Sequence, residues 1–143
     1  MVPYHGQLRA RLLARFHVQI EVSFREGEIK TPAEVPVTGK VVRVFRGAIR
    51  VGDEITFSVH VMRPGDQDRM WCGPSFLEYE TFMHASHIEA FLNGNPPNCE
   101  LALDEYVVLE NPTARPQLSS SRAEYLMELA KWELDGFRRR ILP

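Results

Sequence analysis

The stretch that most constrains the fold is residues 37–61, with the sequence VTGKVVRVFRGAIRVGDEITFSVHV. It predicts two long strands joined by a turn between Gly47 and Gly52, and Gly39 indicates a bend in the first strand. In the second strand, apolar residues that are expected to be buried alternate with residues that are expected to point the other way. The buried set is Ile55, Phe57, Val59 and Val61, and the alternating set is Thr56, Ser58, His60 and Met62. This period of two is typical of a half-buried antiparallel strand.

Residues 16–25 predict another strand, with a clear division into two faces. The face expected to pack into a core carries Phe16, Val18, Ile20, Val22 and Phe24. The opposite face, expected in solvent, carries His17, Gln19, Glu21, Ser23 and Arg25. Five large apolar residues on one face require a core to cover them. Each of them contributes about 1.5–3 kcal/mol when it is fully buried.

Two further segments are predicted as strands. Residues 76–92 contain the β-favouring run at 81–83, although residues 84–92 also have apolar spacing that fits a helix. Asn93 and Gly94 then predict a hairpin turn. Residues 99–109 predict the last strand, and Asp104 interrupts it in a way that indicates a bulge.

The two ends of the chain have different characters. Residues 1–15 form a polar lead-in whose arginines, Arg9, Arg11 and Arg15, are expected in solvent. Residues 111–120 contain two prolines and predict a linker. Residues 121–143 predict a helix, because Ser121 and Glu124 have the spacing of a capping box. An apolar stripe follows at helical spacing: Leu126, Ala130, Leu134, Phe137 and Ile141.

Together these elements predict a mainly β fold. We expect a five-stranded antiparallel barrel of the oligonucleotide/oligosaccharide-binding (OB) type over residues 16–110, followed by the C-terminal α-helix. Bends at Gly39 and near Asp104 are what the closure of a barrel requires. The 143 residues, with 44% hydrophobic content, suit one domain with its own core. The helix is expected to pack outside the barrel or to cover a neighbouring subunit.

Short motifs in the barrel region resemble the netrin-like domain. They are Val42, Val44, Phe45, Arg46 and Gly47, then Ile55, Thr56 and Phe57, and then Cys72 and Gly73. That family includes the tissue inhibitors of metalloproteinases, which are OB-type barrels, so the resemblance implies such a barrel. Similar barrel domains occur in bacterial proteins of unknown role, and this chain resembles those more. In the inhibitors, an N-terminal Cys-x-Cys motif places its amino group on the zinc of the protease. This chain begins Met1-Val2-Pro3-Tyr4 and lacks their many cysteines, so the resemblance does not imply inhibitory activity.

Composition limits the partners and the compartment. The net charge of −2 gives no overall attraction to nucleic acid or to an anionic membrane. No apolar run approaches the about 18 residues of a membrane span, so we expect no membrane partner. Residues 1–16 lack the apolar centre of a secretory signal. We therefore expect a cytoplasmic protein, or an exported one from which a leader has been removed.

One cluster in the sequence has the residue types of a metal site. His84, His87 and Glu89 would share a face on a helix, but the two histidines point to opposite faces of a strand. The strand prediction therefore favours no metal and no cofactor. Cys72 would need a histidine base to act as a nucleophile, and no spacing in the chain identifies one. We predict no catalytic residues and no enzymatic activity.

The two cysteines, Cys72 and Cys99, flank the strand predicted at 76–92. A barrel brings them near each other, and a disulfide there would stabilise the fold by about 3 kcal/mol. A reducing compartment would instead keep both as thiols, so the sequence leaves the two states open.

By elimination, the sequence predicts a binding module for a protein partner or for homo-oligomerisation. The predicted binding surface is the loop at 63–74, because it combines residue types that are enriched at interfaces. These residues are Arg63, Arg69, Met70 and Trp71. The alternative is binding of single-stranded nucleic acid, through arginines and aromatic rings on and near the central hairpin. Acidic residues in the same region, such as Glu21 and Asp53, oppose that alternative.

Overall fold

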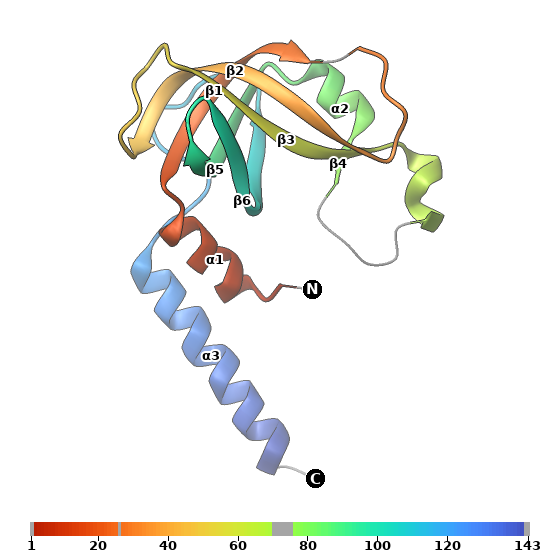
Figure 1. Cartoon of the computed structure of the whole chain (residues 1–143). Helices are drawn as coiled ribbons and strands as arrows, with labels where there is room; N and C mark the ends of the chain where they lie inside the picture. Colours follow the sequence, from red (N-terminus) through yellow and green to blue (C-terminus); the bar gives the residue numbers. More distant parts are fainter. Residues whose placement is uncertain (1, 26, 70–75, 142–143) are drawn as a thin grey trace.

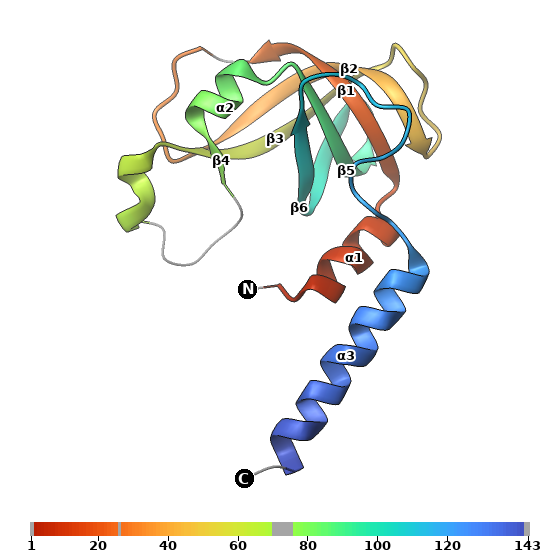
Figure 2. The ribbon, with the colours of Figure 1, turned by 180° about the vertical axis from the view of Figure 1, so that it is seen from behind.

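The structure of the chain, a computed structural model, describes residues 2–25, 27–69 and 76–141. Figures 1 and 2 show a small barrel from which a long helix projects. The elements in chain order are α1 (Tyr4–Leu13), β1 (Phe16–Arg25), β2 (Ala33–Arg46), β3 (Glu54–Met62), the 3-10 helix η1 (Pro64–Arg69), β4 (Leu77–Glu78), α2 (Tyr79–His84), β5 (His87–Asn95), β6 (Asn98–Leu109) and α3 (Arg122–Ile141).

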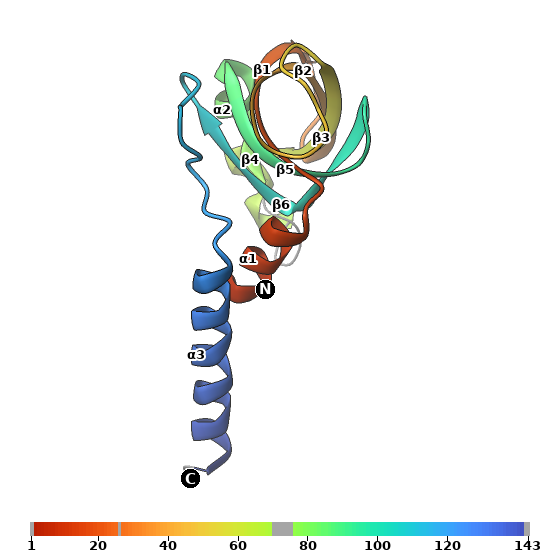
Figure 3. The same ribbon diagram turned by 90° about the vertical axis from the view of Figure 1, so that its left-hand side faces the viewer.

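The five long strands close into a barrel. Neighbouring strands follow the order β2-β1-β5-β6-β3, and pairing of β2 with β3 completes the ring, which Figure 3 shows end on. The predicted five-stranded barrel is therefore confirmed, but its purely antiparallel character is wrong. Strand β6 runs parallel to β3, to which it is paired at Thr56 and Asn98. Strand direction cannot alternate all the way round a ring with an odd number of strands, so one neighbouring pair has to be parallel.

The core fills the inside of this ring. In β3 the burial pattern alternates residue by residue, as the sequence predicted, with Ile55, Phe57, Val59 and Val61 at 0–1% exposure. Phe16, Val18 and Ile20 of β1 face them and are fully buried. The period of two in these two strands thus identifies the inner face of the barrel correctly.

The end of β1 departs from the predicted pattern. Phe24 was expected in the core, but its side chain is 60% exposed. The pairing of β1 with β5 ends at Glu21, so the last residues of β1 have a neighbouring strand only on the β2 side. Because β5 does not continue beside it, this part of β1 lies outside the closed barrel, and its side chains have no core to enter.

Residues 76–92 do not form one strand. Residues 79–84 form the short helix α2, and β5 begins at His87. The helix places Phe82 in the core with 2% exposure, and Met83 packs against the same cluster. Packing of these side chains across one end of the barrel overrides the local preference of residues 81–83 for a strand.

Two irregularities allow the strands to curve. Gly39 lies where β2 is paired with both β1 and β3, and a Cβ atom there would lie 2.7 Å from the backbone oxygen of Glu21. The pairing of β5 with β6 shifts register between Ala90 and Leu92, opposite Leu103 and Asp104, which both have positive φ. The predicted interruption of the last strand at Asp104 is therefore confirmed as a bulge, which bends the strand around the barrel.

Gly47 provides a test of this close packing. It has a φ of +108°, and a Cβ atom would lie 2.5 Å from the Phe16 ring and 2.7 Å from the Arg15 backbone oxygen. Gly47→Ala is expected to lower the free energy of unfolding by about 2–4 kcal/mol, measured by urea denaturation. The matched control is Gly52→Ala, because Gly52 also has a positive φ of +97° but an added Cβ would meet no atom within 4 Å. The control should lose only about 1–2 kcal/mol, and equal losses in the two variants would contradict the steric argument.

Candidate functional site

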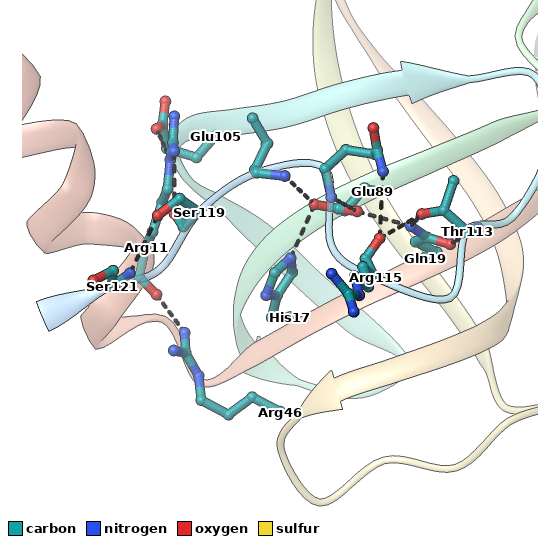
Figure 4. Close-up of polar contacts among 12 residues, drawn as sticks. Arg11, His17, Gln19, Arg46, Glu89, Glu105, Thr113, Arg115, Ser119 and Ser121 are labelled. Carbon is teal, nitrogen blue, oxygen red and sulfur yellow. Dashed lines mark hydrogen bonds and ion pairs between the residues drawn. The ribbon is translucent and has the colours of Figure 1, made fainter. Parts of the chain in front are cut away.

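The linker at 110–121 is held on the barrel by a buried carboxylate. Glu89 of β5 is fully buried, and Figure 4 shows it surrounded by His17 and Gln19 of β1 and by the linker. Its Oε1 accepts hydrogen bonds from Gln19 Nε2 (2.8 Å) and from the backbone N–H of Gln117 (2.8 Å). Its Oε2 accepts one from the backbone N–H of Leu118 (2.7 Å) and lies 3.1 Å from His17 Nε2. We call Glu89, His17 and Gln19 the linker clamp.

The clamp corrects the prediction that the outer face of β1 lies in solvent. His17 and Gln19 are 2% and 0% exposed. The His17 ring stacks on Phe91 with centroids 3.8 Å apart, and the amide of Gln19 bonds both the backbone N–H and the hydroxyl of Thr113. Polar residues on a strand usually indicate solvent, but here Glu89 of β5 and the returning linker satisfy them.

The hydrogen bonds also set the charge state of Glu89. Burial alone raises the pKa of this carboxyl, but its hydrogen bonds outweigh burial and hold the pKa below the ordinary value. Glu89 is therefore a carboxylate at neutral pH, and an ionised acceptor forms stronger hydrogen bonds than a neutral one. A negative charge is thus buried under the linker, with its acceptor sites used by the chain itself.

Arginines attach the N-terminal helix at the same end of the barrel. Arg11 is 8% exposed, its Nε lies 2.6 Å from Glu105 Oε1, and its Nη1 donates to the backbone oxygen of Ser119 (3.1 Å). Arg46 of β2 donates to the backbone oxygens of Arg11 and Ala14. The expectation that Arg11 lies in solvent is wrong, because the returning linker and Glu105 cover it (Figure 4).

The C-terminal helix begins directly after these contacts. Its packing partner is α1: Tyr4 donates its hydroxyl to Glu124 (2.6 Å), and the His5 and Trp132 rings lie 5.3 Å apart. Tyr125, Glu128 and Leu129 of α3 are half-buried. The prediction that the helix packs outside the barrel is corrected, since α3 extends away from the barrel and packs on α1 (Figure 1).

The other side of α3 carries an exposed row of apolar side chains. This α3 apolar face consists of Leu126, Met127, Ala130, Leu134 and Phe137. The four large members are 50–61% exposed. Four large apolar residues grouped on one side of a projecting helix are unusual for a surface that meets only water. This face is the candidate functional site.

A second feature is a cavity of about 220 Å³ on the barrel wall. It lies between β3, β6 and the start of β2, and it is lined by Glu34, Ser58, His60, Cys99, Glu100, Leu101 and Asp104. Three of these residues carry carboxylates, which disfavour a phosphate. Burial raises the pKa of the Cys99 thiol, so this sulfur is protonated at neutral pH and is a poor nucleophile.

The structure only partly describes the binding surface predicted from the sequence. The Arg63 guanidinium lies 3.8 Å over the Tyr79 ring and bonds Ile29 and Thr31, so it joins the β1–β2 loop to α2. Arg69 ends η1. Met70, Trp71 and Cys72 lie outside the described residues, so the binding surface and the Cys72–Cys99 disulfide stay predictions.

The three residues that the sequence offered as metal ligands, His84, His87 and Glu89, lie in different surroundings. His84 is exposed at the end of α2, where its Nδ1 is 2.8 Å from the Glu80 backbone oxygen. His87 is bonded to Ser86, and Glu89 lies in the linker clamp. Within residues 2–25, 27–69 and 76–141, no group of three such side chains is arranged to hold a metal.

Comparisons with known proteins leave the family open. A scan against protein-family models found no match. A search of curated proteins found no significant match either. The resemblance to netrin-like domains therefore stays a prediction. Among the helices that the structure describes, none combines the length and apolar character needed to cross a membrane.

The linker clamp can be tested by substitution. Each oxygen of the Glu89 carboxylate accepts hydrogen bonds from two donors. In Glu89→Gln, one of these oxygens becomes an NH2 group, which cannot accept, so one of the two pairs of donors loses its acceptor. We expect a loss of about 2–4 kcal/mol in the free energy of unfolding at neutral pH, measured by urea denaturation. The control is Glu54→Gln, an exposed residue at the start of β3, which should change stability by less than about 0.5 kcal/mol. A loss in Glu89→Gln as small as in the control would contradict the clamp.

The same carboxylate predicts a dependence on pH. Because its folded-state pKa is lowered, Glu89 stabilises the fold above the unfolded value of about 4.3, and this stabilisation is lost as pH falls through the folded value. The difference in stability between the native chain and Glu89→Gln should therefore shrink as pH is lowered below about 4. A difference that stays constant from neutral to acidic pH would show that the charge of Glu89 contributes nothing.

Proposed function

We propose that the chain is a non-enzymatic protein-binding module in which an OB-type barrel presents α3 to a protein partner. The observation that carries this proposal is the α3 apolar face, whose four large side chains are at least half exposed. A helix with a continuous apolar row on one side is a common form of protein-recognition surface. The α3 apolar face is therefore the proposed docking surface.

The attachment of α3 supports this function. The linker clamp and the contacts of Arg11 fix the linker up to Ser119, and Tyr4 fixes the first turn of the helix. Ser119 and Ser121 both bond Glu124, which orders the start of α3. A helix held in one orientation loses less conformational entropy on binding than a flexible segment does. The barrel and α1 thus act as a support for the docking surface.

The assignment to the OB type rests on strand order. The ring runs β1-β2-β3-β6-β5, with its parallel pair between the third and the last long strand and with α2 between β3 and β5. This arrangement fits a five-stranded Greek-key barrel of the OB type. Members of that group bind many kinds of ligand, so the fold alone does not select one.

Nucleic acid is the weaker candidate ligand because of the charges on the barrel. Glu34, Glu100 and Asp104 line the cavity beside β3, and β3 itself begins with the exposed Glu54. We expect fluorescently labelled single-stranded DNA and RNA oligonucleotides to show no rise in anisotropy with protein in the micromolar range at low salt. A bovine serum albumin titration is the negative control. Micromolar binding that weakens with added salt would favour the nucleic-acid alternative over the protein-binding function.

Crosslinking from α3 tests the protein-binding function directly. The photoreactive residue p-benzoylphenylalanine replaces Phe137 in the docking surface or, as the matched control, the exposed Asp135 outside the apolar row. In cells of the source organism, irradiation should give a discrete protein adduct from position 137 and much less from position 135. An adduct identified by mass spectrometry names the partner. Equal labelling from both positions, or no adduct from position 137, would contradict the proposal.

A further inference from the structure

The α3 apolar face has the spacing of a heptad repeat. In a heptad abcdefg, Met127, Leu134 and Ile141 occupy successive a positions. Ala123, Ala130 and Phe137 occupy the d positions between them. Apolar residues at a and d form the contact line between two helices that coil around each other. The 20 residues of α3 give a contact line of about 30 Å.

Trp132, whose ring contacts His5 of α1, lies away from this line, while Glu124, which accepts a hydrogen bond from Tyr4, occupies an e position beside it. Tyr125 and Trp132 occupy f positions and Leu129 a c position, on the opposite side of the helix from a and d. Trp132 contacts His5, and Leu129 and Tyr125 are half-buried. Figure 3 shows α1 and the barrel to one side of the α3 axis. The a and d positions from Ala123 to Phe137 are all exposed, so a second helix reaches them without displacing α1.

The flanking charges select the occupant. Glu133 is at a g position and Arg138 at the next e position, and both are exposed. In two parallel helices, the g residue of one lies beside the e residue five positions later in the other. Two parallel copies of α3 therefore bring Glu133 of each copy beside Arg138 of the other, giving two equivalent opposite-charge pairs. Within the described part of the chain, neither residue forms an ion pair of its own.

An antiparallel arrangement of two copies is less favourable. With the helix centres aligned, it places Lys131 beside Lys131 and Glu133 beside Glu133 of the other copy. It also pairs Arg138 with Glu124, whose oxygens already accept from Tyr4 and Ser119. The charges thus favour the parallel arrangement, in which the two barrels lie at the same end of the helix pair.

We infer that the occupant of the docking surface is a second copy of this chain, bound through a parallel pairing of α3 with α3. This inference rests on the proposed function and names its partner. The a and d side chains form the contact line, and the Glu133–Arg138 pairs set its direction. Phe137 supplies the largest side chain of the line, and it meets its own counterpart across the two-fold axis.

The first measurement is the mass of the native chain by sedimentation equilibrium in the micromolar range. The expected result is a dimer, and Phe137→Asp should weaken the dimer by about a hundredfold, because it buries two carboxylates in an apolar contact. Phe137 is 58% exposed in the single chain, so the variant should keep the native circular dichroism, and it should keep the native urea midpoint at concentrations where both proteins are monomeric. A monomeric native chain, or a dimer that Phe137→Asp does not weaken, overturns the inference.

Charge reversal tests the parallel direction. Glu133→Arg and Arg138→Glu should each weaken the dimer by about tenfold, because each replaces two attractive pairs by two repulsive ones. The double variant restores opposite charges and should return to within about twofold of the native dissociation constant. The matched controls are Asp135→Arg and Arg139→Glu, which lie outside the contact line. They should leave the dissociation constant of the dimer unchanged. A double variant weaker than either single variant overturns the parallel pairing.

The failure of this inference can be told apart from failure of the proposed function. A monomeric chain whose position 137 crosslinks to a different protein overturns self-association and leaves the protein-binding function standing. A monomeric chain with no adduct from position 137 overturns both. An adduct with twice the mass of the chain, together with a dimer in sedimentation, supports both.

Discussion

The arrangement of the molecule depends on the carboxylate of Glu89. One buried negative charge accepts hydrogen bonds from the backbone of Gln117 and Leu118, and it thereby turns the linker back across β1 and β5. Without such an acceptor, two linker N–H groups would be buried without partners, which is costly. The burial of a charge is tolerated because His17 and Gln19 bond the same carboxylate. The direction in which the linker leaves the barrel, and so the starting point of α3, follows from this cluster.

The structure divides into a closed support and a projecting helix. Every long strand of the barrel is paired on both sides over part of its length, so none of these strands has an edge that is unpaired throughout. Exposed large apolar side chains lie on several elements, and the group on α3 includes Leu134 and Phe137. Contacts of α1 with the opposite side of α3 give the helix support without covering its apolar row. Such a division suits a module whose binding energy resides in one element.

The local sequence pattern predicted the buried residues correctly where a strand has one face in the core and the other in solvent. The alternation in β3 predicted its buried residues, and the turn between Gly47 and Gly52 followed from glycine chemistry. The pattern predicted burial wrongly where another segment of the chain covers the outer face of a strand. His17 and Gln19 looked like solvent-facing residues, because nothing in residues 16–25 indicates that the linker returns to cover them. Residues 79–84 became a helix because Phe82 reaches the core from that conformation, which depends on the shape of the barrel end.

The sequence by itself determined the strand periods, the five-stranded barrel, the C-terminal helix and the spacing of the apolar row on it, because these depend on which residues share a face of an element. It also contained the heptad positions of Glu133 and Arg138. Only the tertiary structure decided that Glu89 is a buried acceptor of linker hydrogen bonds, and that Arg11 is buried against Glu105. It alone decided that α3 packs on α1 and leaves Leu134 and Phe137 exposed. The reason is that spacing fixes which side chains lie together, whereas what covers them depends on contacts between segments far apart in the chain.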